Sequence, residues 1–341
     1  MKFLRLLLFP FAIIYDLVTA IRNYFYDKSI YTSHTFPLPV IAVGNLSTGG
    51  TGKTPQTEHL IRLLADKYNL ATLSRGYGRK TRGFILANET ASAQTIGDEP
   101  FQFFTKFKSI RVAVDANRVE GMEHLLSLSP KPEVILLDDA YQHRRLKAGF
   151  YILLTAYGDL YADDYILPAG NLREGRYAAA RANIIIVTKC PPGLAETEQQ
   201  KITARLRPKQ WQQVYFTCIA YDNFVHSGNG KREVAEVRNT QKVLVAGIAK
   251  PQPFYDYLAG ADDVIKTYPD HHEFTAAEIN ELDTLAKNRI IVTTEKDYMR
   301  LQGRLPDNRL YYLPIQSRFL NRGNDFDKTI LNYVGKSTTN R

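Results

Sequence analysis

Apolar runs alternate with segments of helical periodicity from residue 38 to about residue 190. Several of these runs are apolar at every position, as expected for parallel strands that are covered by helices on both faces. Between them lie segments such as Pro55–Lys67, in which the leucines and Ile61 fall on one face of a predicted helix. The alternation predicts an α/β sandwich with strands at Leu38–Val43, Leu70–Leu73, Ile110–Val114, Val134–Leu137, Tyr151–Leu154 and Ile184–Val187.

The pattern changes after residue 212. Two strand-like pieces, Tyr215–Tyr221 and Glu233–Val237, flank the turn signal Ser227-Gly228-Asn229-Gly230, which predicts a β-ribbon. A second α/β unit follows, and the capping box from Thr275 to Glu278 announces one of its helices. Its other predicted elements are Lys242–Ala246, Pro253–Leu258, Val264–Thr267 and Arg289–Thr293. We therefore predict two α/β/α sandwich lobes, at 31–212 and 239–335, joined by a two-stranded β linker at 213–238.

Residues 1–30 have a composition of their own. The uncharged stretch Leu6–Tyr15 follows Lys2 and Arg5, and apolar residues continue beyond Asp16 with basic residues between them. This stretch is too short to cross a bilayer, because a spanning helix needs about 20 apolar residues. An aromatic-rich helix with basic flanks is instead typical of a helix that lies in the membrane interface. We predict a membrane-associating helix at 1–30; the alternatives are a buried core helix and a secretory signal peptide.

The charge of the chain favours anionic partners. Its 341 residues carry a formal net charge of +9, which attracts nucleotides, phospholipid surfaces and phosphorylated substrates. The basic residues form short clusters instead of one long run, so we predict no nucleic-acid partner. The two cysteines, Cys190 and Cys218, have no zinc-like spacing, which fits a reducing compartment and argues against a disulfide framework.

A glycine-rich loop follows the first predicted strand and precedes a predicted helix. Its glycines allow backbone N–H groups to point inward at a phosphate chain, and the helix N-terminus adds a partial positive charge. Lys53 is expected to reach the β- and γ-phosphates of a bound nucleotide, and Thr54 to hold Mg²⁺. Ser47 stands where the usual P-loop pattern has glycine, and a flexible glycine turn is the competing interpretation. The predicted nucleotide-binding residues are Thr48, Gly49, Gly50, Thr51, Gly52, Lys53 and Thr54.

An acidic pair follows another apolar strand. Asp138 and Asp139 come directly after Val134–Leu137, at the carboxyl end where α/β proteins bind ligands. We predict that one of the pair contacts Mg²⁺, directly or through water; a solvated acidic turn is the alternative.

A P-loop by itself leaves GTPase, ATPase and kinase open. Guanine-specific GTPases usually carry Asn-Lys-x-Asp after a late strand. The nearest match is Thr188-Lys189-Cys190-Pro191, which lacks both the Asn and the Asp. A GTPase is therefore disfavoured.

Motifs from the N-terminus to about residue 301 resemble the tetraacyldisaccharide 4′-kinase family, the lipid A 4′-kinases of Gram-negative bacteria. The loop with Ser47 is one of these motifs, and Ala140 and Gly175 are local departures from the family pattern. The remaining motifs follow in the family's order: Ser74-Arg75-Gly76-Tyr77-Gly78-Arg79, Gly97-Asp98-Glu99-Pro100, Asp138-Asp139-Ala140-Tyr141-Gln142-His143, Leu167-Pro168-Ala169-Gly170-Asn171-Leu172-Arg173-Glu174, Pro269-Asp270-His271-His272 and Thr294-Glu295-Lys296-Asp297.

The resemblance implies an ATP- and Mg²⁺-dependent enzyme at the cytoplasmic face of the bacterial inner membrane. Its substrate would be a tetraacylated glucosamine disaccharide 1-phosphate, phosphorylated at the 4′-hydroxyl on the pathway to lipid A and lipopolysaccharide. It also implies two lobes with the chemistry in the cleft between them. No obligate protein partner is evident.

The resemblance also implies roles for individual residues. The family's catalytic aspartate corresponds to Asp98 and its histidine partner to His271, and a carboxylate oriented by a histidine can accept the proton of a sugar hydroxyl. Asp98 could instead cap the following helix, and His271 could belong to an ordinary loop. The candidates for gripping the disaccharide and its 1-phosphate, each with solvated surface charge as the alternative, are Arg75, Arg79, Asn171, Arg173 and Glu174.

Two other functions stay open. One is a cytosolic P-loop NTPase that acts as a switch in metal-centre or cofactor assembly, which would be stimulated by a protein partner. The other is a non-catalytic nucleotide-binding scaffold, which the intact Lys53, Thr54 and aspartate pair disfavour.

Overall fold

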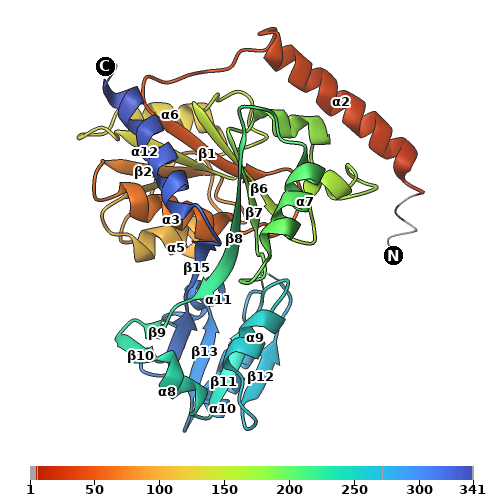
Figure 1. The fold of residues 1–341 in the computed structure, drawn as a ribbon. Helices are drawn as coiled ribbons and strands as arrows, with labels where there is room; N and C mark the ends of the chain where they lie inside the picture. The colour runs from red at the N-terminus through yellow and green to blue at the C-terminus, as the bar shows by residue number, and fades with distance from the viewer. Residues whose placement is uncertain (1–4, 6, 271, 340–341) are drawn as a thin grey trace.

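Two β-sheets organise the chain in the computed structural model, which describes residue 5, residues 7–270 and residues 272–339. A nine-stranded sheet has the order β15-β8-β7-β6-β1-β5-β2-β4-β3, and a six-stranded sheet has the order β10-β9-β14-β13-β11-β12. We call the parts built on these sheets the large lobe and the small lobe; the two lie one above the other in Figure 1.

The strands and helices have the following bounds. The strands of the large sheet are β1 (Val40–Asn45), β2 (Leu70–Ser74), β3 (Ile85–Leu86), β4 (Arg111–Val114), β5 (Val134–Asp138), β6 (Phe150–Ala156), β7 (Ile184–Thr188), β8 (Gln213–Tyr221) and β15 (Ile315–Phe319). Those of the small sheet are β9 (Phe224–Ser227), β10 (Gly230–Glu233), β11 (Lys242–Ala246), β12 (Val264–Thr267), β13 (Ile290–Thr294) and β14 (Leu310–Leu313). The large-lobe helices are α2 (Phe9–Asp27), α3 (Lys53–Leu64), α4 (Ala93–Ile96), α5 (Asp98–Lys106), α6 (Arg118–Leu126), η1 (Tyr161–Asp163), η2 (Arg176–Arg181), α7 (Glu196–Leu206) and α12 (Gly323–Thr339). The small-lobe helices are α8 (Val234–Arg238), α9 (Gln252–Leu258), α10 (Ala276–Leu285) and α11 (Glu295–Leu301).

Strand β1 shows why the central strands are apolar throughout. Ile41 and Val43 pack into the core that α3 and α12 cover, whereas Val40 and Ala42 pack into the core that α6 covers. Both faces of the strand are therefore buried, as in other parallel sheets between two helical layers. The six strands predicted from residue 38 to 190 are confirmed, each within two residues of its expected bounds, and the chain is a mixed α/β protein with parallel sheets.

The connection between the lobes differs from the prediction. Strand β8 pairs antiparallel with β15, so the two strands that link the lobes come from distant parts of the chain. The turn at 227–230 instead joins β9 to β10 inside the small sheet. The piece predicted as the strand Glu233–Val237 is mostly helix α8, because Val234 and Val237 have helical spacing and both are buried. The predicted pairing of Tyr215–Tyr221 with Glu233–Val237 is therefore wrong, although the turn between them does join a hairpin of shorter strands.

The C-terminal boundary of the second lobe is also corrected. Residues 315–335 were assigned to it, yet Phe326, Ile330 and Val334 of α12 are fully buried in the same core as Ile41 of β1. The chain thus enters the small lobe after β8 and returns to the large lobe through β15. Figure 1 shows the blue C-terminal helix lying against the large sheet.

Helix α2 runs along the outside of the large lobe (Figure 1). Of its 19 residues only Ala12, Thr19 and Asn23 are buried, so it is not the core helix that the sequence left open as an alternative. None of the helices in the described part of the chain combines the length and the hydropathy that a transmembrane span requires.

Candidate active site

The glycine-rich loop lies between β1 and α3. Helix α3 begins at Lys53, and Gly52 before it has a φ of 81°, in the left-handed region that favours glycine. Gly49 also has a positive φ, of 112°. The hydroxyl of Thr51 is buried and has no hydrogen-bond partner within the described residues. A buried donor without a partner fits a loop that is completed by a bound anion.

The aspartate pair lies beside this loop. Strand β5 pairs parallel with β1 and places Asp138 opposite Val43, so both carboxyl ends meet at one edge of the sheet. Asp138 accepts a hydrogen bond from the hydroxyl of Thr57 at 3.1 Å. Burial, followed by the charge of Asp139, raises the pKa of Asp138 to about 7, while the charge of Lys53 opposes the shift. Lys53 Nζ lies 3.5 Å from Asp139 Oδ1.

The segment from residue 164 to 174 closes the loop from a second side. The backbone N–H of Thr48 donates to the oxygen of Asn171, and that of Arg173 donates to the oxygen of Leu46, both at 2.7 Å. The Arg173 guanidinium donates to Asp139 at 3.3 Å. Asn171 and Arg173 therefore lie against the predicted nucleotide site.

Glu174 has a different environment. Its side chain is 1% exposed and pairs with Arg22 of α2 at 2.7 Å and with Arg181 at 2.5 Å. Both oxygens are engaged, so in this structure Glu174 joins α2 to the large lobe. This contact was not predicted from the sequence.

Arg75 and Arg79 follow strand β2. Arg75 is exposed, and Arg79 is half-buried and donates to the backbone oxygen of Gly83 at 2.7 Å. The buried Arg118 at the start of α6 was not singled out in the sequence. Burial, and next the charge of Arg75, lower its pKa to about 10, and the charges of Asp138 and Asp139 act in the opposite direction. Arg75 and Arg118 therefore add positive charge near the aspartate pair.

Residues at the end of β7 hold the loop as well. The Thr188 hydroxyl donates to the oxygen of Thr51 at 2.7 Å, and Lys189 Nζ donates to the oxygen of Gly50 at 2.6 Å. In the sequence these residues were weighed only as an incomplete guanine motif. Their position after a buried strand was the signal that could have identified them.

Asp98 is the first residue of α5. Gly97 is the N-cap of this helix, and no side chain caps it. Asp98 is therefore not the N-cap, which was the alternative interpretation of the sequence. The Asp98 carboxylate forms an ion pair with Arg300 of α11, across the two lobes. Arg300 also donates to the backbone oxygen of His272 at 3.3 Å. His271 itself lies outside the described residues.

A cluster of charged side chains also joins the two lobes through α5, the helix that begins at Asp98. Lys106 of α5 pairs with Glu58 of α3 at 2.8 Å and with Glu295 of α11 at 2.7 Å. Burial and the charge of Glu58 raise the pKa of Glu295 to about 7, and Lys106 and Arg62 oppose the shift. One lysine thus fixes the helix of Asp98 to both helix α3 and the small lobe.

This cluster predicts a pH dependence of stability. Because the folded protein binds the Glu295 proton more tightly than the unfolded chain, the free energy of unfolding should fall as pH rises from 4.5 to about 7. The contribution is at most about 3 kcal/mol. Glu295→Gln should remove this part of the slope in thermal midpoints measured from pH 5 to 8. Glu236→Gln, at an exposed position of the same lobe, is the control. If the thermal midpoint of Glu295→Gln changes with pH as that of the wild type does, Glu295 is not the group responsible.

The family model for tetraacyldisaccharide-1-P 4′-kinase matches residues 4–335. Proteins named tetraacyldisaccharide 4′-kinase are 57% identical in Flavobacterium psychrophilum, over 100% of both chains, and 56% identical in Flavobacterium johnsoniae, over 98% of both. The relative in Bacteroides thetaiotaomicron is 42% identical over 98% of this chain and 94% of its own.

A solved structure is similar along the whole chain. It is that of LpxK from Aquifex aeolicus in complex with ATP, with a TM-score of 0.77 and 28% sequence identity, covering 97% of this chain and 99% of the other.

Proposed function

The chain belongs to the tetraacyldisaccharide 4′-kinase family, and on that premise we propose how its residues carry out the reaction. It is a kinase of lipid A biosynthesis that uses ATP. The reaction transfers the terminal phosphate of ATP to the 4′-hydroxyl of a tetraacylated glucosamine disaccharide 1-phosphate. The observation that carries the proposal is the phosphate loop, with Lys53 between Asn45 and Asp139 at the edge where β1 and β5 end.

The phosphate chain of ATP would bind at Thr48–Thr54. The two positive-φ glycines leave backbone N–H groups free of side-chain bulk, and Lys53 adds a charge for the β- and γ-phosphates. As the bond to the β-phosphate oxygen breaks and that to the sugar oxygen forms, the protein's main task is to neutralise charge and position the reactants.

Thr54, Asp138 and Asp139 would hold Mg²⁺. Within the described residues no three carboxylates, histidines or cysteines gather as a metal site, so the protein offers only part of a coordination shell. This fits Mg²⁺, which keeps waters and phosphate oxygens among its ligands. Bound Mg²⁺ would supply charge neutralisation on the phosphates and favour the ionised form of Asp138.

Asp98 would accept the proton that the sugar hydroxyl loses, with His271 orienting it. Support comes from Arg300, which contacts both Asp98 and the backbone of His272, the residue after His271. The candidates for binding the disaccharide and its 1-phosphate stay as predicted: Arg75, Arg79, Asn171, Arg173 and Glu174. For Glu174 this role would require exchanging a bond to Arg22 or Arg181.

Helix α2 would attach the enzyme to the cytoplasmic face of the inner membrane. Its inner side is fixed by Arg22 on Glu174, and Asp27 pairs with Arg144 at 2.5 Å. Its outer side presents large apolar residues to solvent, at 45–62% exposure: Phe11, Ile14, Leu17, Val18, Ile21 and Tyr24. Contiguous exposed apolar surface with fixed polar anchors below it is typical of an interfacial helix.

One assay tests the proposed reaction. Labelled ATP, Mg²⁺ and acylated disaccharide 1-phosphate in detergent micelles should give labelled lipid, and Lys53→Ala should lower the rate about 10²–10³-fold because a positioned charge on the phosphates is lost. Lys67→Ala, an exposed lysine shortly after α3, is the matched control. Phosphate release without lipid labelling would favour the NTPase switch, and neither product would favour a binding scaffold.

A further inference from the structure

The large lobe contains a cavity whose lining residues have no part in the reaction proposed above. It is a cavity of about 640 Å³ between η1, η2, the C-terminal end of α7 and the loop that leads to β8. The lining residues used below are Asp163, Arg176, Arg205, Arg207, Lys209 and Gln212.

The cavity is basic. Four cations line it, against the single carboxylate of Asp163. Arg205 pairs with that carboxylate at 2.5 Å. Over the ranges that the structure describes, the side chains of Arg207 and Lys209 have no hydrogen-bond or ion-pair partner. Two positive charges therefore remain available to an anion.

The loop that carries these charges is held in place. The Gln212 amide donates to the backbone oxygens of Ala179 and Ala182, both at 2.8 Å, and its oxygen accepts from the backbone of Lys209 at 2.8 Å. Arg207 ends α7 with a φ of 48°, a position that usually takes glycine. An arginine there carries a conformational cost that the surrounding fold has to offset.

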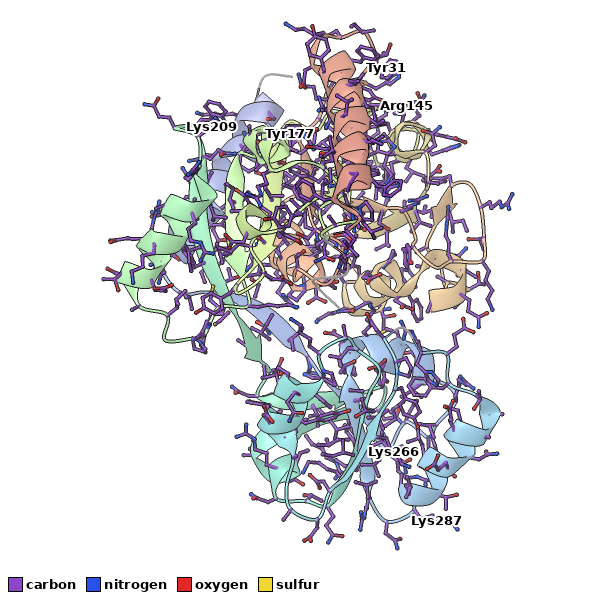
Figure 2. The ribbon with its side chains drawn as sticks, turned by 90° about the vertical axis from the view of Figure 1, so that its right-hand side faces the viewer. Tyr31, Arg145, Tyr177, Lys209, Lys266 and Lys287 are labelled. Atoms are coloured by element: carbon purple, nitrogen blue, oxygen red, sulfur yellow. The ribbon has the colours of Figure 1, made fainter. Side chains whose placement is uncertain are left out.

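The cavity adjoins helix α2. Arg176 and Tyr177 line it and also line a neighbouring cavity of about 310 Å³ whose other wall includes Phe9 and Ile13 of α2. The Tyr177 hydroxyl donates to Asp16 of that helix at 3.2 Å. Figure 2 shows Tyr177 and Lys209 at the end of the molecule opposite Lys266 and Lys287 of the small lobe. The same loop carries Trp211, which is 64% exposed.

We propose that this basic cavity binds the phosphate head group of an anionic phospholipid in the membrane on which α2 lies. This inference rests on the membrane attachment proposed above. Each lysine or arginine near an anionic bilayer strengthens the binding of a protein to that bilayer about fivefold. An apolar helix and a basic site together attach a protein more firmly than either contact does alone. Exposed tryptophan prefers the head-group region. Trp211 lies two residues after Lys209 on the same loop, so we expect it to enter that region when the cavity holds a lipid phosphate.

The test uses the one tryptophan of the chain as a reporter. Full-length protein is mixed with vesicles of phosphatidylcholine alone, or with 30% phosphatidylglycerol added, and Trp211 emission and its quenching by brominated lipid are recorded. We expect a blue shift and quenching that strengthen when the anionic lipid is added. Emission that stays unshifted and unquenched while the protein sediments with anionic vesicles would overturn the proposal.

Matched double variants locate the effect. Arg207→Ala with Lys209→Ala should lower affinity for the anionic vesicles about 25-fold and leave affinity for neutral vesicles unchanged. Lys287→Ala with Arg304→Ala removes the same charge from exposed residues of the small lobe and should lower it less than twofold. Equal losses in the two variants, or none in the first, would refute a lipid site here.

Two further arms separate the sources of failure. Glycerol 3-phosphate without vesicles should leave Trp211 emission unchanged; a saturable shift would assign the cavity to a soluble phosphate ester and overturn the proposal. Weak binding of the wild type to neutral vesicles would count against attachment by α2, whereas the gain on adding phosphatidylglycerol still tests the cavity. Kinase activity on detergent-dispersed lipid should be the same for Arg207→Ala with Lys209→Ala as for the wild type.

Discussion

Asp98→Ala is expected to lower lipid phosphorylation about 10³-fold while ATP binds with nearly unchanged affinity. The carboxylate is proposed to take the proton of the sugar hydroxyl, whereas the phosphate chain of ATP is proposed to bind at Thr48–Thr54. His271→Ala should lower turnover by a similar factor if it orients Asp98. Single-turnover transfer and equilibrium ATP binding, measured on the same preparations, separate the two effects.

The ion pair with Arg300 requires its own control, because Asp98→Ala also removes a contact between the lobes. Asp98→Asn keeps the shape of the side chain and should be as slow as Asp98→Ala. Arg300→Ala breaks the same contact and leaves the carboxylate, so it should retain far more activity. If Arg300→Ala and Asp98→Asn are equally slow, the loss stems from the lobe contact and Asp98 is not the base.

Removal of residues 1–26 is expected to move the protein from the membrane to the soluble fraction and to raise the KM for lipid. Six apolar side chains of α2 that enter the interface at about 1 kcal/mol each would change the partition on the order of 10⁴-fold. Sedimentation with inner-membrane vesicles and KM in mixed micelles are the measurements. Unchanged sedimentation would contradict the anchor.

The deletion also removes Arg22, the ion-pair partner of the buried Glu174. A variant that keeps this ion pair is therefore needed alongside it. Leu17→Gln with Ile21→Gln alters only exposed positions of α2 and keeps that ion pair. It should release most of the protein from membranes without lowering its thermal midpoint. Ile265→Gln, at an exposed apolar position of the small lobe, should have no effect on sedimentation.

The sequence by itself determined the local elements and the glycine-rich loop between β1 and α3. Strands β5 and β7 begin at the residues predicted, because fully apolar runs between turn signals have one stable environment, the interior of a parallel sheet. The capping box at Thr275 forms as predicted, since its bonds join residues three apart. The glycine-rich loop could be predicted for the same reason, because its geometry depends on adjacent backbone positions.

Only the tertiary structure decided which distant segments meet. The pairing of β8 with β15, the burial of α12 against β1, and the contacts of Arg300 with Asp98 and of Arg22 with Glu174 all join residues nearly a hundred or more positions apart. Short-range patterns of polarity hold no information about such partners. Many charged or apolar segments of the chain could pair with, or pack against, the same residues. Packing of the lobes and α2 against one another selects among them. It brings Asn171, Arg173 and Asp139 to the glycine-rich loop and leaves Asp98 on Arg300 and Glu174 on Arg22.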